Sequence, residues 1–416
     1  MTMGVTGDLA SRALALAETP LHIFNIVALL KTENSPGQKA SIDLVIVKQF
    51  HLEESLVSSL RSSGMFESVT VVDPYYSFRN KSAVVLTTLQ AIVAPRAHCQ
   101  KRCSELLKGF GTDYRYLFAG CASIYAMDMK NWFVPQGETI FFEEGEGSYL
   151  GNFVKSAACF DREILKRSKS LSRWASSTIL NITSCGHLRF NVKYLFLYRP
   201  DCVERGVYRQ GIDIRPLTPL ICGASDVAGL FDAPCKLKAD WIFLGSPDVD
   251  RSSAEKSQSR SLLMCIAKSG HGVVYRRHPR SCDSDDGLLD NIYIEDSHCL
   301  WEALCLHGVI NDDSVLFGFG STAQINPARM FGLRPTLVFL HRFLSDGIDK
   351  RYAERTYRQA LLMCGEDRVF APKTEEELGD LVSKLAGRKR DRKGCNEQGG
   401  RDALRGKDEF EQIQSG

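Results

Sequence analysis

Apolar and polar residues alternate in a regular rhythm along the first third of the chain. The segment 19–31 places its apolar side chains on one helical face, with Thr19 positioned to cap the helix and Pro20 suited to its first turn. A second helical segment, 52–64, ends in a glycine. Apolar runs of strand length lie at 41–50, 67–74, 113–120 and 138–145. Doubly buried strands separated by helices predict a parallel sheet covered on both faces.

The same rhythm returns in the second half of the chain. Strands are predicted at 240–247, 272–280, 291–296 and 334–342, helices at 259–272 and 298–308, and a strand, tight turn and helix at 313–332. The pattern predicts the α/β fold class, with two Rossmann-like domains facing each other across a cleft. The expected parts are an N-terminal domain at 13–230, a linker around 223–238, a C-terminal domain at 238–386 and a disordered, highly charged tail at 387–416.

The composition limits the class of partner. The chain has 416 residues, of which 44% are hydrophobic and 25% charged, and its net charge is only +2. These values are typical of an ordinary soluble protein. So small a net charge gives no global field that would attract DNA or RNA, and we expect no nucleic-acid partner.

The cysteines and the N-terminus bear on the compartment. The 14 cysteines include no C-x-x-C pair, so we expect buried, reduced thiols. Asp8, Arg12 and Glu18 interrupt the apolar residues near the N-terminus, which argues against a signal peptide. No window holds about 18 uncharged apolar residues, as a membrane span would need. We expect a cytoplasmic protein that acts at the membrane, if at all, on its inner surface. Four cysteines lie within or beside apolar segments: Cys202, Cys265, Cys305 and Cys364.

Two adjacent carboxylates, Glu143 and Glu144, stand where a predicted strand runs into a glycine-rich turn that begins at Gly145. The turn does not suit a pyrophosphate, because these carboxylates and Glu146 would repel it. A carboxylate at a strand end can instead take a proton from a hydroxyl group of a neutral substrate. The alternative is a solvated acidic loop.

A basic tip follows the predicted strand 272–280. It brings Arg276, Arg277 and His278 together, and Pro279 prevents further ladder pairing. Such a group can bind an anion, and the histidine can donate a hydrogen bond or a proton to a phosphate that leaves. The alternative is a basic surface turn.

A third strand end carries glycines and hydroxyl groups. Gly318 and Gly320 form a tight turn, and Ser321 and Thr322 stand where the next helix begins. Free backbone N–H groups, two hydroxyls and a helix N-terminus make a phosphate cradle, although the lysine of a P-loop is absent. The alternative is simple capping of the helix.

Two weaker signals complete the strand ends of the second half. Gly245 lies in a Gly-Ser-Pro turn, and Asp248 and Asp250 follow it as an Asp-x-Asp pair. That pair holds a metal in some glycosyltransferases, but nothing else in the sequence supports a metal site. Glu302 lies on the helix at 298–308, where a carboxylate could accept hydrogen bonds from ribose; the alternative is an exposed side chain.

The order of these motifs resembles the bacterial sialyltransferases with the GT-B fold, and most closely glycosyltransferase family 52, the lipooligosaccharide sialyltransferases. Those families carry an acidic-acidic-glycine motif, a His-Pro motif and a Ser-Ser or Ser-Thr motif. The resemblance spans roughly 17–345, and the Thr-Pro-Leu-His at 19–22 is similar to the Thr-Pro-Leu motif at the start of that family. The matching residues are Glu143-Glu144-Gly145, His278-Pro279 and Ser321-Thr322.

The resemblance implies an inverting sialyltransferase that moves sialic acid from CMP-sialic acid to a galactose-type hydroxyl of a glycan, without a metal or cofactor. It implies that His278 stabilises or protonates the CMP phosphate and that Ser321 and Thr322 hold it. The remaining residues implied on the CMP-sugar side are Gly245, Arg277, Pro279, Glu302 and Gly320. Those implied on the acceptor side are Thr19, Pro20, Asn25 and Gly145.

The resemblance leaves the catalytic base open. Glu143 or Glu144 is implied, with Asp248 as a rival, because the family's acidic motif usually contains aspartate where this chain has two glutamates. The donor also has alternatives, CMP-Kdo or a UDP-sugar, and a non-catalytic nucleotide-sugar-binding protein is a further alternative. The basic segment 161–174 is expected near an anionic membrane surface or in a homodimer contact, or else as a solvated helix face.

Overall fold

The computed structural model divides into two compact units, which we describe separately. The first comprises Met1–Pro234, His298–Val309 and Arg329–Gly332, and the second comprises the rest. The structure describes residues 11–35, 40–74, 110–149, 192–203, 211–220, 239–245, 253–278, 288–295, 299–344 and 348–387, except 112 and 122, together with 208, 229–231 and 237. The segment 161–174 and the tail from 388 onward lie outside these residues.

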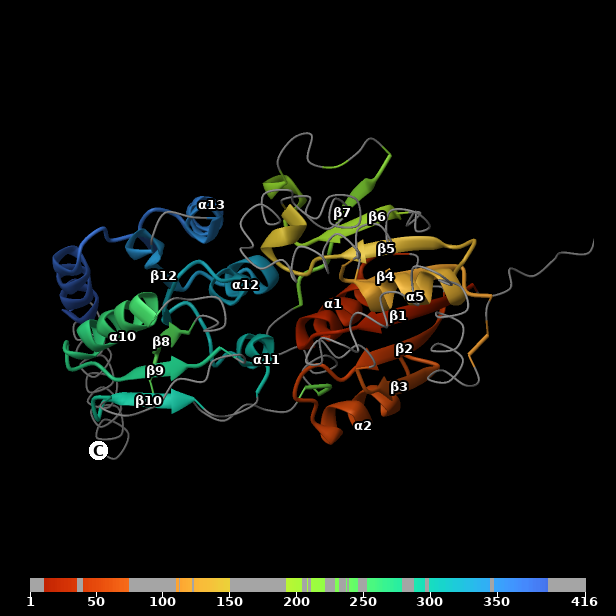
Figure 1. Ribbon diagram of the computed structural model, residues 1–416, viewed down its shortest axis with the longest axis horizontal. Coiled ribbons are helices and arrows are strands. Elements are labelled where there is room, and N and C mark those ends of the chain that lie inside the picture. The colour runs from red at the N-terminus through yellow and green to blue at the C-terminus, as the bar shows by residue number, and fades with distance from the viewer. Residues whose placement is uncertain are drawn as a thin grey trace, which may run out of the picture. The chain divides into compact units, whose positions relative to one another are not determined.

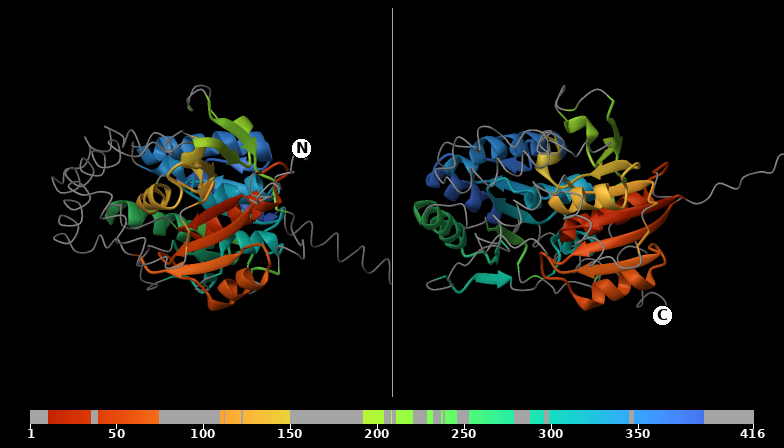
Figure 2. Two further views of the ribbon diagram at one scale, coloured as in Figure 1. Left: turned by 90° about the vertical axis from the view of Figure 1, so that its right-hand side faces the viewer. Right: turned by 45° about the vertical axis from the view of Figure 1, so that its right-hand side comes forward.

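The first unit contains a seven-stranded sheet in the order β3-β2-β1-β4-β5-β6-β7, with every pair parallel. β1, β2 and β3, drawn red to orange, lie side by side in each view (Figure 1 and Figure 2). The strands are β1 (Arg12–Ala17), β2 (Ser41–Val47), β3 (Ser68–Val72), β4 (Tyr116–Ala119), β5 (Glu138–Phe142), β6 (Val192–Leu197) and β7 (Asp213–Pro216).

Helices cover both faces of this sheet, and the alternation within β1 explains why. Ala13, Ala15 and Ala17 pack into one apolar cluster with α1, whereas Leu14 and Leu16 pack into another with α5. A strand buried on both faces must be apolar at every position, as in a parallel sheet with helices on each side. The helical elements are α1 (Pro20–Lys31), α2 (Glu54–Ser62), α5 (Ile124–Trp132), α11 (Trp301–Leu306) and the short 3-10 turns η2 (Glu146–Tyr149) and η3 (Pro200–Cys202).

The second unit contains a six-stranded parallel sheet in the order β10-β9-β8-β11-β12-β13. Its strands are β8 (Trp241–Leu244), β9 (Val273–Arg276), β10 (Ile292–Glu295), β11 (Val315–Gly318), β12 (Thr336–Phe339) and β13 (Val369–Phe370). Its helices are α10 (Ser253–Ala267), α12 (Thr322–Phe331, whose last residues group with the first unit), α13 (Ile348–Cys364), the 3-10 turn η5 (His341–Phe343) and a last helix over 375–387.

The expected α/β class with two parallel-sheet domains is confirmed, but the first strand of the first sheet was missed. Arg12 and Glu18 were treated only as interruptions of an N-terminal apolar segment, whereas Arg12–Ala17 form β1, an interior strand of the sheet. β6 and β7 were also not predicted. The helix at 298–308, expected in the C-terminal domain, groups with the first unit as α11.

Three observations concern the cysteines, membrane-spanning helices and metal sites. Among the six cysteines in the described ranges, Cys305 and Cys364 are buried, whereas Cys202 and Cys265 are half-buried. Among the helices that the structure describes, none is long and apolar enough to cross a membrane. Within the same residues, no group of three or more His, Cys, Asp or Glu side chains is arranged to hold a metal ion.

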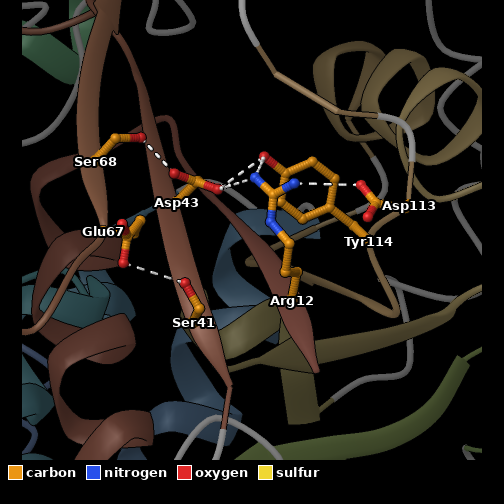
Figure 3. A network of polar contacts seen from close by, with 7 residues as sticks. All are labelled: Arg12, Ser41, Asp43, Glu67, Ser68, Asp113 and Tyr114. Carbon is orange, nitrogen blue, oxygen red and sulfur yellow. Dashed lines mark hydrogen bonds and ion pairs between the residues drawn. The ribbon is translucent and has the colours of Figure 1, made fainter. Parts of the chain in front are cut away.

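A polar network joins the amino ends of the first sheet, at the edge opposite the strand ends discussed below (Figure 3). Asp43 on β2 is almost fully buried and accepts hydrogen bonds from Arg12 Nη2 at 3.0 Å and from the Tyr114 hydroxyl at 2.8 Å. Its other oxygen accepts from the Ser68 hydroxyl. One buried carboxylate therefore ties together β1, β2, β3 and the segment that leads into β4.

We expect Asp43→Asn to lower the free energy of unfolding by about 1–3 kcal/mol, because the new amide nitrogen can no longer accept a hydrogen bond from a buried donor. Chemical denaturation measures the change. Glu67→Gln is the matched control, since Glu67 is exposed and accepts only a long 3.4 Å bond from Ser41. Equal effects of the two substitutions would contradict the role of Asp43.

Candidate active site

The carboxyl ends of three neighbouring strands bring polar residues to one edge of the first sheet. Glu18 follows β1, Cys121 follows β4 by one residue, and Glu143 and Glu144 follow β5. The order β1-β4-β5 is unbroken and parallel, so these ends meet at the same edge. Ligands of open α/β sheets bind at such edges.

Glu143 is buried and fully engaged. Its side chain is 2% exposed and its Oε1 lies 3.3 Å from Arg329 Nη1. Its Oε2 accepts hydrogen bonds from the Tyr149 hydroxyl and, at 3.0 Å, from the Tyr198 backbone N–H. Arg329 is itself fully buried, with its guanidinium carbon 4.3 Å from the centre of the Tyr149 ring. Glu143 is thus held in an enclosed ion pair, and its role as a base remains a prediction.

Asn25 belongs to the same buried network. It is fully buried on α1, its Nδ2 donates to the Glu143 carbonyl at 2.5 Å, and its Oδ1 accepts from the Tyr198 hydroxyl at 2.9 Å. The sequence analysis expected Asn25 on the sugar side, but its amide is used to hold the end of β5. No local pattern could have indicated this, because its partners lie 118 and 173 residues away.

Glu144 points to a different environment from its neighbour. It is exposed, its backbone N–H donates to Ser148 Oγ at 2.9 Å, and Gly145 beside it adopts a φ of 147°, which a residue with a side chain rarely adopts. Crowding by nearby protein atoms nevertheless raises the pKa of the Glu144 carboxyl, although a hydrogen bond with Cys121 lowers it. Glu144 thus remains accessible to a substrate.

Glu18 is the carboxylate that the sequence analysis missed. Only 7% of the residue is exposed, and burial raises its pKa to about 7, with a hydrogen bond from Ser123 opposing the shift and the charge of Glu144 adding to it. The Cys121 thiol lies 4.0 Å from Glu18 Oε2. Burial and the two carboxylates raise the pKa of this thiol far above its ordinary value, so it stays protonated.

His22 fixes the backbone at this edge. Its Nδ1 accepts a 3.2 Å hydrogen bond from the Glu18 N–H, and burial lowers its pKa to about 3, so the ring is neutral at ordinary pH. Its Nε2 is buried without a partner among the described residues. A Cβ at Gly120 would lie 2.4 Å from that nitrogen, which explains the glycine after β4.

The first turn of α1 forms as predicted. Thr19 caps it, its Oγ1 accepting from the His22 N–H at 3.2 Å, and Pro20 occupies the first helical position. Both residues are half-buried. Their expected contact with a sugar remains a prediction.

In the second unit, Gly245 and His278 lie side by side at the carboxyl ends of β8 and β9. The Gly245 N–H donates to the Arg276 carbonyl at 2.8 Å, and a Cβ at Gly245 would lie 3.1 Å from the His278 nitrogen. Arg277 and His278 are half-buried. The predicted site residues Asp248 and Pro279 lie outside the described residues.

The glycine turn after β11 packs closely against α13, since a Cβ at Gly320 would lie 2.6 Å from the Ala353 Cβ. Gly320 has a φ of +87°, Thr322 begins α12, and the Ser321 hydroxyl is buried without a hydrogen-bond partner among the described residues. The sequence analysis missed Gln324, which is fully buried. Its Oε1 accepts from the Gly320 N–H at 3.0 Å while its Nε2 donates to two strand carbonyls. Gln324 therefore holds the turn against the sheet.

Glu302 does not lie where the sequence analysis expected it. It is 7% exposed on α11, which groups with the first unit rather than with the C-terminal sheet. Its charge helps to raise the pKa of Tyr198, behind burial and Glu143. Its expected contact with ribose remains a prediction.

Solved structures supply the comparison for the whole chain. Os79 of O. sativa in complex with UDP matches with 12% identity, a TM-score of 0.53 and coverage of 91% of this chain and 92% of that one. LpCGTa in complex with UDP matches with 12% identity, a TM-score of 0.51 and coverage of 90% of each chain. Arabidopsis thaliana UGT89C1 complexed with UDP-L-rhamnose matches with 11% identity, a TM-score of 0.50 and coverage of 90% of this chain and 89% of that one. The fold is GT-B.

At such identities the likeness shows the fold alone, and it confirms the expected fold family. No protein-family model and no curated protein sequence matches the chain. The resemblance to sialyltransferases of family 52 therefore rests on the sequence motifs.

Proposed function

We propose that the protein is a glycosyltransferase that moves a sugar from a nucleotide-sugar donor to a hydroxyl group of an acceptor. The observation that carries the proposal is the turn at Gly320 and Ser321. A buried hydroxyl without a partner stands there where α12 begins, at the carboxyl edge of a parallel sheet. A helix N-terminus with an unsatisfied donor suits the phosphate of a nucleotide.

The second unit would hold the donor. Ser321 and Thr322 would bind the phosphate nearest the sugar, and Gly245 allows the His278 backbone to lie close beside the end of β8. His278 and Arg277 would stabilise the negative charge that develops on the phosphate as the glycosidic bond breaks. These residues can supply such stabilisation themselves, which fits the expected independence from metals.

Two donor classes have support of different kinds. The similar solved structures contain UDP or UDP-L-rhamnose, which favours a UDP-sugar. The motif order in the sequence favours CMP-sialic acid or, as a chemical relative, CMP-Kdo. The difference is chemical: a UDP-sugar brings a diphosphate to the cradle, and a CMP-sugar a single phosphate.

The test measures nucleotide release from a panel of UDP-glucose, UDP-galactose, UDP-N-acetylglucosamine, CMP-sialic acid and CMP-Kdo. Each donor is assayed with and without lactose or N-acetyllactosamine, and with EDTA or Mg²⁺. Acceptor-stimulated release from one donor class supports the transferase and identifies that class. Binding of nucleotide without turnover of any donor would instead support a non-catalytic nucleotide-sugar-binding protein.

We expect His278→Ala to lower kcat/KM for the accepted donor by about 10²–10⁴-fold, because the leaving phosphate loses its proton or hydrogen-bond donor. His271→Ala is the matched control. His271 precedes the same strand β9 at its opposite end and stacks on Trp241, with ring centres 4.3 Å apart. Equal losses in the two variants would show that His278 acts only on the fold.

A further inference from the structure

We propose that Glu18 is the carboxylate that accepts the proton of the acceptor hydroxyl during transfer. This inference rests on the proposed glycosyltransferase function and names its base. Neither the acidic motif of the sequence nor its similarity to known sialyltransferases indicates this residue.

The first argument is position. Glu18 follows β1, which lies inside the sheet with β2 on one side and β4 on the other. The side chain lies at the carboxyl edge, with the Cys121 thiol 4.0 Å from its Oε2. Ser123, which caps α5 by accepting from the Ala126 N–H at 3.0 Å, keeps its hydroxyl proton for a hydrogen bond to Glu18. The carboxyl group is thus oriented by a fixed donor.

The His22 side chain next to Glu18 has a buried nitrogen without a hydrogen-bond partner among the described residues. His22 holds the backbone of Glu18 through Nδ1, and its Nε2 is buried next to Gly120, one residue before Cys121. The residue is 1% exposed, and a buried polar atom without a partner costs free energy. The chain accepts this cost at the residue that fixes the backbone of Glu18, which indicates that the position of Glu18 matters.

The three carboxylates at this edge differ in burial and in partners. Glu143 is enclosed with Arg329 and has no capacity left. Glu144 is exposed and supplies a negative charge next to Glu18. The other titratable groups that face Glu18, the Cys121 thiol and the His22 imidazole, are both neutral. Burial and the charge of Glu144 place the pKa of Glu18 at about 7, which suits a base that works near neutral pH.

Glu18 acts while the new glycosidic bond forms. The acceptor O–H bond breaks, and its proton passes to the Glu18 carboxylate. The oxygen forms a new bond to the anomeric carbon of the donor sugar, and the bond from that carbon to the phosphate oxygen breaks. The electron pair of that bond leaves with the nucleotide phosphate.

The test compares Glu18→Gln with Glu138→Gln on the full chain, using the donor that the panel identifies. Glu138 is a matched control, because it begins β5 at the opposite edge and pairs only with the exposed Lys193 at 3.0 Å. Glu18→Gln should lower kcat by about 10²–10⁴-fold with nucleotide affinity unchanged. Glu138→Gln should leave both unchanged.

A pH profile separates catalysis from structure. The wild-type kcat/KM should rise with pH through a midpoint near 7, because the base must be ionised. Glu144→Gln should move this midpoint to lower pH, since it removes the negative charge that raises the pKa of Glu18. Two outcomes would overturn the assignment of Glu18 while leaving the proposed function intact. One is that the wild type transfers sugar and Glu18→Gln retains the same rate. The other is that Glu144→Gln leaves the midpoint of the pH profile unchanged. A wild type that turns over no donor would overturn the proposed function and this inference with it.

Discussion

Arg329→Met is expected to lower the free energy of unfolding by about 3–5 kcal/mol, because it leaves Glu143 as a buried carboxylate without its cation. Both side chains are almost completely enclosed, so water cannot replace the lost partner. The Tyr149 hydroxyl and the Tyr198 N–H remain as donors to Glu143, but neither carries a charge. Chemical denaturation of wild type and variant measures the difference.

The double variant Arg329→Met with Glu143→Gln is the control for this prediction. Removing both charges should recover a large part of the lost stability, because the cost of the single variant is the unpaired charge rather than the missing contact. If the double variant is as unstable as Arg329→Met alone, the packing of Arg329 on Tyr149 carries the effect. If Arg329→Met changes stability by less than about 0.5 kcal/mol, the buried pair does not hold the end of β5.

This pair also shows where sequence reasoning stopped. Two glutamates in a row at a strand end can be predicted to lie near a substrate site, because parallel strands present their carboxyl ends together. Which of the two faces inward depends on Arg329, 186 residues further along the chain. A contact of that range leaves no trace in local spacing, so the sequence could not separate Glu143 from Glu144.

Glu18 was missed in the sequence for a more local reason. The apolar runs that form β2 to β5 and β8 to β12 were long enough to predict as strands. Once these strands were predicted, the glycine, histidine and serine residues after them could be recognised as strand-end residues. The run Arg12–Ala17 is rich in alanine, which has little preference for strands, and it stands next to the N-terminus. Because β1 was not recognised, the residue after it, Glu18, was not examined as a strand end.

Glu18→Gln is expected to stabilise the protein at pH 8 by about 3 kcal/mol, while changing its stability little at pH 4. The folded-state pKa of about 7 lies above the ordinary value of 4.5, so the folded protein holds this proton more tightly than the unfolded chain. The stability that the protonated group contributes is fully present below about pH 4.5 and is lost as pH rises through about 7. Glutamine keeps the neutral form at every pH and removes the loss.

Denaturation midpoints of the two proteins at pH 4, 6 and 8 measure this window, and Glu144→Gln provides the control. Without the charge of Glu144, the pKa of Glu18 should fall, so the gain from Glu18→Gln at pH 8 should shrink in that background. A gain that is the same at all three pH values would show that Glu18 is not held in a raised-pKa environment. If Glu18 is the base, Glu18→Gln should increase stability only at high pH and should also lower kcat. The two results together would mean that the raised pKa of Glu18 serves catalysis and lowers the stability of the folded protein.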